Sequence, residues 1–160
     1  MDSVEVAIVG AGPYGLSLAA HLRRAGVGYR QFGFPMSLWR SRMPRGMYLK
    51  SQGFASNLSD PDETHTLRNF CLETGREYAD YGLPVSLETF VDYGEWFQLN
   101  RGLEVEEVLV TSIRQTARGF LLELADGATA EAEKVVVAVG VEYFPYIPAP
   151  LAELPRSLSS

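Results

Sequence analysis

The sequence predicts a single α/β domain in which a parallel sheet, begun by a βαβ unit, continues into an antiparallel β-meander. Three features predict this fold. An apolar, β-branched run at residues 4–9 passes through a glycine-rich turn into an Ala- and Leu-rich helical pattern. Residues 103–133 form short alternating segments separated by turn residues, as antiparallel strands do. Residues 134–140 form a mainly apolar run, which is typical of a strand buried in a parallel sheet.

The turn after the first strand carries Gly10, Gly12 and Gly15 in the spacing Gly-x-Gly-x-x-Gly. Between a strand and a helix, this spacing is typical of dinucleotide sites. The first glycine permits the tight turn, the second lets the backbone approach a pyrophosphate, and the third allows close helix packing. Pro13 suits the first helical turn, and Gly26 ends the helix. We predict pyrophosphate binding at the helix N-terminus; the alternative is a glycine-rich turn without a ligand.

Residues 27–32 predict a second, parallel strand that closes the βαβ unit. Dinucleotide sites usually place an acidic residue at the end of this strand, where it accepts hydrogen bonds from the adenosine ribose. Gly33 occupies that position here, between two phenylalanines. Either another group, such as a backbone atom or Arg40, holds the ribose, or the dinucleotide binds more weakly. A less favoured alternative is that Arg40 binds a 2′-phosphate.

Residues 35–101 are a long excursion that a simple nicotinamide-binding domain would lack. Its first part is the basic region of an otherwise acidic chain, as expected of a loop around a phosphate-bearing cofactor. The alternative is a solvated loop with Trp39 anchored in the core. Further along, apolar spacing predicts helices over 64–74, ended by Gly75, and over 87–99, capped by Ser86. The cations of the basic region are Arg40, Arg42, Arg45 and Lys50.

The last third of the chain predicts strands and then an extended connection. We expect meander strands at 105–113, 119–124 and 129–133, followed by a separate parallel strand at 134–140. Prolines then predict that residues 145–160 are an extended connection.

Composition limits the classes of function. The 160 residues carry a net charge of −6, with both signs mixed along the chain, so we expect no nucleic-acid partner. No apolar run reaches the roughly 20 residues of a membrane span, and no signal peptide precedes the first strand, so we expect a cytoplasmic protein. Cys71 is the only cysteine and is expected to pack as a small apolar residue. Two isolated histidines predict no metal site.

The ordered set of these features resembles the start of a flavoprotein with two dinucleotide-binding domains. More narrowly, it is similar to the flavin-dependent monooxygenases of the lysine and ornithine N-hydroxylase group and related FAD-dependent oxidoreductases. The resemblance implies a Rossmann-like FAD-binding domain over residues 1–144 that is incomplete at the C-terminus. Residues 145–160 would then be a Pro-rich connection cut short before a nicotinamide domain. The segments that carry the resemblance are 10–18, 38–40, 46–51, 58–61, 90–96 and 135–140.

The resemblance also implies a cofactor, FAD, and a set of residues that bind it. The glycine turn would hold the pyrophosphate, residues of the basic region would lie along the flavin and adenosine, and one backbone in the meander would approach the adenine. No side chain is implied as an acid–base catalyst. The implied residues are Gly10, Gly12, Pro13, Tyr14 and Gly15 at the turn; Gly33; Trp39, Arg40, Met47, Lys50 and Ser51 in the excursion; and Val110 and Gly140.

In the complete family NAD(P)H reduces the flavin, and the reduced flavin hydroxylates a nucleophilic substrate with oxygen. The glycine spacing occurs once in this sequence. We therefore expect the FAD-binding portion of such an enzyme, inactive alone and completed by another polypeptide or an oligomer. Two alternatives are a nucleotide-binding module without a redox role and a fragment that does not fold stably alone.

Overall fold

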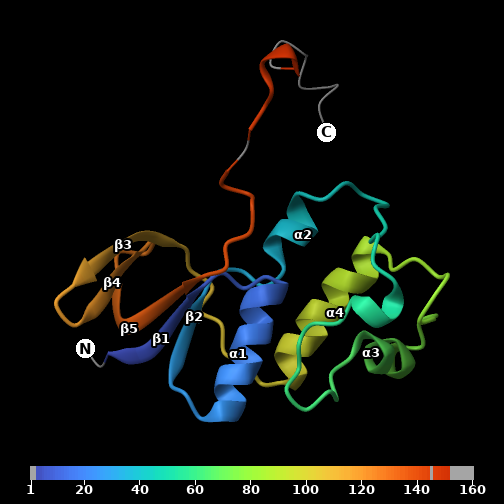
Figure 1. The fold of residues 1–160 in the computed structure, drawn as a ribbon, viewed down its shortest axis with the longest axis horizontal. Coiled ribbons are helices and arrows are strands. Elements are labelled where there is room, and N and C mark those ends of the chain that lie inside the picture. Colours follow the sequence, from blue (N-terminus) through green and yellow to red (C-terminus); the bar gives the residue numbers. More distant parts are fainter. Residues whose placement is uncertain (1–2, 145, 152–160) are drawn as a thin grey trace.

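The computed structural model describes residues 3–144 and 146–151, which form a five-stranded mixed sheet on one side and a group of helices on the other (Figure 1). The strand order is β2-β1-β5-β4-β3. β1 lies between two parallel neighbours, β2 and β5, while β5, β4 and β3 pair antiparallel. This arrangement confirms the predicted α/β fold. The strands are β1 (Val4–Val9), β2 (Tyr29–Phe32), β3 (Val110–Thr116), β4 (Gly119–Leu124) and β5 (Thr129–Val137).

The βαβ unit forms as the sequence predicts. Helix α1 (Pro13–Ala25) follows β1 with Pro13 in its first turn, and Gly26 ends it in the left-handed conformation, φ 72°. Its buried face includes Leu16 and Ala19, which pack on the sheet side chains Val6 and Ile8. The predicted second strand begins two residues later than expected, at Tyr29.

The excursion folds into a helical cluster on the far side of α1 from the strands (Figure 1). Thr66 and Ser86 cap α3 and α4, their side chains accepting hydrogen bonds from the backbone N–H groups of Asn69 and Thr89. Tyr93 and Phe97 of α4 are fully buried and join α1 to the cluster. Both predicted helices are confirmed, although the first begins at Leu67 and not at residue 64. The elements are α2 (Ser37–Ser41), the short 3₁₀ helix η1 (Gly53–Ala55), α3 (Leu67–Thr74) and α4 (Leu87–Asn100).

Two strand predictions in the meander are wrong. The strand expected at 105–113 begins only at Val110, and the residues before it make a single bridge, from Glu106 to Phe32 of β2. The strands expected at 129–133 and 134–140 are one strand, in which Ala132 pairs with both Phe120 of β4 and Val4 of β1. The change from alternating to continuous apolar residues marks a change of neighbouring strand, not the end of a strand.

The apolar end of β5 is more exposed than expected. Val136 and Val137 are 38% and 62% exposed. In the described residues this half of β5 pairs with β1 alone, because its pairing with β4 stops at Ala132. The expectation of a strand buried on both faces is therefore wrong for these residues.

The chain leaves the sheet after β5 in an extended path that ends in a short 3₁₀ helix, η2 (Ala149–Leu151) (Figure 1). Of the predicted connection over 145–160, residues 146–151 are exposed and residues 145 and 152–160 lie outside the described part. Among the helices described here, none has both the length and the hydropathy that crossing a membrane requires. The domain boundary at 144 and the cytoplasmic location remain predictions.

Candidate cofactor-binding site at the glycine turn

The first glycine of the turn is fixed by its neighbours. Gly10 has φ 119°, a conformation that side chains rarely adopt, and its N–H donates to the Phe32 carbonyl of β2 at 2.8 Å. A Cβ added at this position would lie 2.6 Å from the carbonyl carbon of Ala138. The ends of β1, β2 and β5 therefore meet at Gly10, and only glycine fits between them.

Gly15 is fixed by the approach of α1 to the same turn. A Cβ here would lie 3.0 Å from the carbonyl carbon of Gly10 and 2.9 Å from Nε2 of Gln31. Any side chain would push the first turn of α1 away from β1. Gly15 therefore allows the close helix–strand packing that the sequence predicts.

Gly12 is different, because the fold does not require a glycine there. Its φ of −78° is open to any residue, and no described atom lies within 4 Å of an added Cβ. The space beside Gly12 is open at the start of α1. A pyrophosphate needs such an open space in order to approach the backbone. Of the three glycines, Gly12 is the one whose presence packing does not explain.

The N-terminus of α1 lacks the side-chain cap that the other two long helices have. Gly12 offers no capping bond and the first turn holds no acidic residue, whereas Thr66 and Ser86 cap α3 and α4. The first N–H groups of a helix have no partner within the helix, and they lie at the positive end of its dipole. Pro13 occupies the first turn, and the Tyr14 side chain is 86% exposed. The geometry fits an anionic group at this end.

Gln31 supports the turn, although the sequence pattern alone did not single it out. Its side chain is 1% exposed, and Nε2 donates to the Gly10 carbonyl at 3.0 Å. That bond fixes the Gly10 carbonyl toward β2. Its Oε1 accepts no hydrogen bond from the described residues. In the sequence, the feature that could have identified Gln31 is a polar residue within the predicted strand 27–32, two residues before Gly33.

Gly33 lies where the ribose-binding acid is expected, and the structure explains why no acid is there. Its φ is 128°, and an added Cβ would lie 3.3 Å from the Ala11 nitrogen of the glycine turn. Its N–H donates to the Glu106 carbonyl at 3.0 Å. The chain thus leaves β2 in a conformation that strains any L side chain.

Two of the four cations of the basic region are engaged with acidic partners. Arg40 forms an ion pair with Glu95 of α4. Arg42 donates to the Glu142 carboxylate at 2.7 Å, and this hydrogen bond raises the pKa of Arg42. Two further cations, Arg45 and Lys50, are exposed and have no hydrogen bond or ion pair to any described residue. The region as a whole is less available to a phosphate than its composition suggests.

The other residues implied for the cofactor contact parts of the protein away from the glycine turn. The Trp39 ring packs edge-on against Phe90, with centroids 4.7 Å apart, as the alternative of a core-anchored tryptophan expects. Met47 accepts a backbone hydrogen bond from Leu87 at 2.9 Å. Their roles along the cofactor, like those of the remaining residues, stay predictions. Ser51 bonds to Ser56, Val110 pairs with Leu124 at the start of β3, and Gly140 lies against Leu38 of α2.

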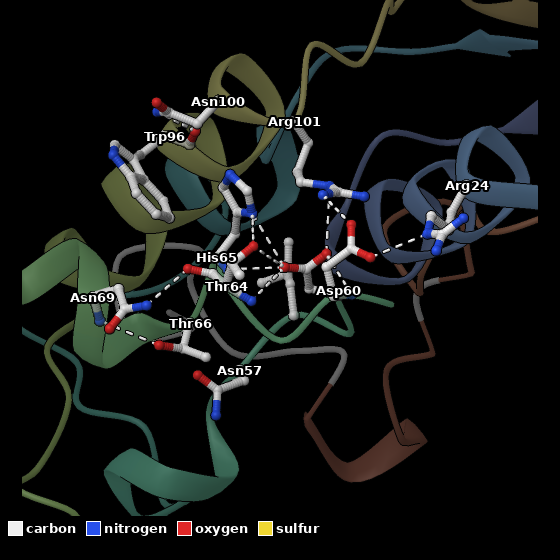
Figure 2. Close-up of polar contacts among 12 residues, drawn as sticks. Arg24, Asn57, Asp60, Thr64, His65, Thr66, Asn69, Trp96, Asn100 and Arg101 are labelled. Atoms are coloured by element: carbon white, nitrogen blue, oxygen red, sulfur yellow. Dashed lines mark hydrogen bonds and ion pairs between the residues drawn. The ribbon is translucent and has the colours of Figure 1, made fainter.

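A buried carboxylate organises the loop on the helical side of α1 (Figure 2). The Asp60 side chain is 2% exposed and accepts hydrogen bonds from the N–H groups of Thr64 and His65 at 2.9 and 2.8 Å. Burial alone would raise the pKa of Asp60. The hydrogen bonds from His65, Asp62 and Thr64 outweigh burial and lower the pKa to about 2. Arg101 at the end of α4 adds an ion pair at 3.3 Å.

The same loop is tied to α1 and α4. Arg101 and Arg24 both pair with Asp62, at 2.8 and 3.1 Å. The Tyr93 hydroxyl accepts from Leu58 N–H and donates to the His65 carbonyl, and burial raises the pKa of this tyrosine. The loop is therefore a structural clamp that fixes α1, and with it the glycine turn, against the helical cluster.

The two histidines and the cysteine are placed within the fold: His21 hydrogen-bonds with Ser59 at 2.8 Å, and His65 with Asp60 at 3.1 Å. Cys71 is buried, and burial raises the pKa of its thiol, which agrees with packing as a small apolar residue. No cluster of three or more metal-ligating side chains occurs among the described residues.

Comparison with sequence-family models gives one match. The sequence model of the FAD binding domain family matches residues 3–55, which contain the glycine turn, Gly33 and the start of the excursion. No curated protein matches the chain in sequence.

Solved structures match over nearly the whole chain. A flavin-containing monooxygenase from Stenotrophomonas maltophilia is 22% identical with a TM-score of 0.77, over 92% of this chain and 42% of that one. The ornithine N-hydroxylase of Kutzneria sp. 744 is 25% identical with a TM-score of 0.77, over 92% and 39%. A bacillithiol disulfide reductase from Staphylococcus aureus is 17% identical with a TM-score of 0.70, over 88% and 39%.

These matches confirm the fold and the predicted resemblance to flavin-dependent monooxygenases, including the ornithine N-hydroxylase group. The chain spans about two fifths of the length of these structures.

Proposed function

We propose that this chain is the FAD-binding portion of an NAD(P)H-dependent monooxygenase or related oxidoreductase. The observation that carries the proposal is the open space at Gly12 beside the uncapped N-terminus of α1. Gly10 and Gly15 are glycines because the fold leaves no room, but Gly12 faces open space. A pyrophosphate in that space accounts for both the glycine and the missing cap.

The residues of the turn would bind and orient the cofactor. The N–H groups at the start of α1 would donate to the pyrophosphate, while Gln31 fixes the Gly10 carbonyl toward β2. Bound FAD supplies the electron transfer of the reaction. We nominate no acid–base catalyst from this chain.

We place reduction by NAD(P)H and substrate binding outside these 160 residues. The chain spans about two fifths of the structures that it matches, and the glycine spacing occurs once in it. The chain alone would therefore bind FAD without catalytic turnover.

Replacing Gly12 by valine tests the proposal. The purified chain should bind FAD and unfold at a higher temperature when FAD is added, because the ligand stabilises the native state. G12V should lose FAD binding yet keep the melting temperature of the ligand-free parent, since nothing lies within 4 Å of the added Cβ. Fluorescence titration and thermal unfolding measure the two quantities.

Gly28→Ala is the matched control. Gly28 lies before β2, at the opposite end of the strands, and a Cβ there would lie 3.5 Å from the Glu5 carboxylate. The control should retain the parent's affinity for FAD. A parent that shows no thermal shift at saturating FAD, or a G12V chain that binds FAD as well as the parent, would contradict the proposal.

A further inference from the structure

Position 33 cannot supply the carboxylate that a dinucleotide site normally presents to the adenosine ribose. A side chain at φ 128° would be strained, and its Cβ would press on the Ala11 nitrogen. The Met36 N–H also donates to the Ala11 carbonyl, at 3.1 Å, so residues 33–36 are held against the glycine turn. A ribose next to this segment would need an acceptor from elsewhere.

The segment before β3 brings two glutamates to this place. Glu106 N–H donates to the Gln31 carbonyl at 2.8 Å, and the Glu106 carbonyl accepts from Gly33 N–H at 3.0 Å. These two bonds form a parallel bridge beside the end of β2. Glu107 is the next residue after Glu106, whose carbonyl accepts the Gly33 hydrogen bond.

The carboxylates near Gly33 differ in whether they already have a partner in the protein. Both Glu106 oxygens accept hydrogen bonds from Arg30, each at 2.6 Å, and Arg40 occupies Glu95. Glu107 is exposed and has no hydrogen bond or ion pair to any residue that the structure describes. It is the carboxylate beside Gly33 that remains able to accept from a ligand.

Glu107 also lines a hollow of about 380 Å³. Phe34 and Pro35, the residues that follow Gly33, form an apolar part of its wall, and the paired Arg40 and Glu95 also line it. An apolar wall next to a carboxylate suits a nucleoside, whose base is apolar on its faces and whose ribose carries hydroxyl donors.

We propose that Glu107 replaces the missing acid and accepts hydrogen bonds from the ribose hydroxyls of an adenosine diphosphate moiety bound at the glycine turn. The inference rests on the proposed function, because it requires a dinucleotide at that turn. The acceptor thus comes from the segment before β3 and not from the end of β2.

Calorimetric titration of the chain with ADP and with 2′-deoxy-ADP tests the inference. The parent should bind ADP about tenfold more tightly than 2′-deoxy-ADP, because a hydrogen bond to a charged acceptor is lost with the 2′-hydroxyl. Glu107→Ala should weaken ADP binding about tenfold and reduce the ratio between the two ligands to about one. Glu104→Ala, which removes the same charge from an exposed position three residues earlier, should leave the ratio unchanged.

The outcomes separate the two proposals. A parent that binds FAD but does not distinguish ADP from 2′-deoxy-ADP overturns the role of Glu107 and leaves FAD binding standing. An E107A chain that keeps the parent's ratio overturns that role in the same way. A parent that binds neither ADP nor FAD overturns the proposed function itself.

Discussion

Gly10, Gly12 and Gly15 belong to one motif but have three different surroundings. Gly10 and Gly15 face backbone atoms, from Ala138 in the first case and from Gly10 itself in the second, whereas Gly12 faces open space. The motif therefore combines two residues that shape the turn with one that admits a ligand. Substitutions at the three positions should affect stability and binding differently.

Gly15→Ala should lower the free energy of unfolding by about 1–3 kcal/mol, because a methyl group has to displace the backbone of the turn or the Gln31 amide. Gly12→Ala is the matched substitution, and it should change stability by less than about 0.5 kcal/mol. Urea unfolding of both ligand-free variants measures the difference. Equal destabilisation by the two substitutions would contradict these assigned roles.

At the scale of elements, α1 is held from two sides. The sheet packs against its apolar face, and the loop around Asp60 joins its outer side to α4 through Asp62, Arg24 and Arg101. The helices α3 and α4 each begin with a capping side chain, whereas α1 begins with a glycine. The ion pairs of the clamp thus hold α1 near its C-terminal end, where Arg24 lies, and leave its uncapped N-terminus open.

The Asp60 clamp predicts a specific pH dependence of stability. The pKa of Asp60 is lowered from 3.8 to about 2, so its ionised form stabilises the fold above about pH 4, and this contribution is lost as the pH falls toward 2. Asp60→Asn should therefore cost about 2 kcal/mol more at pH 6 than at pH 2. Urea unfolding across this range measures it.

Glu77→Gln serves as the control for the clamp. Glu77 is exposed and makes no hydrogen bond or ion pair with the residues described, so its substitution should leave the pH profile of stability close to that of the parent. An Asp60→Asn variant whose profile runs parallel to that of the parent would show that the carboxylate is not the stabilising form.

At the scale of the whole molecule, the chain has the fold of an FAD-binding domain and about two fifths of the length of the enzymes that it matches. FAD bound to this chain should stay oxidised when NADPH is added, because hydride transfer requires a nicotinamide held against the flavin. Dithionite, which needs no binding site, should reduce it. The visible absorbance of the flavin under anaerobic conditions distinguishes oxidised from reduced FAD. Stoichiometric bleaching by NADPH would contradict the proposal that reduction by NAD(P)H requires residues outside this chain.

The sequence alone determined the βαβ unit, the helices α3 and α4, and the glycine turn. These features depend on local patterns: β-branched residues, glycine spacing, the helix cap at Ser86, and the stops at Gly26 and Gly75. Neighbouring residues in the chain carry that information, so no knowledge of distant contacts was needed.

Only the tertiary structure decided which strand neighbours which and which charges are available. β5 is one strand with two sets of partners, the Arg40 guanidinium is occupied by Glu95, Gln31 bonds to the turn, and the segment of Glu106 and Glu107 is bridged to the end of β2. Each of these facts depends on residues far apart in sequence that meet in space. Local periodicity does not encode such meetings, because it reports which side of an element is apolar and not what that side faces.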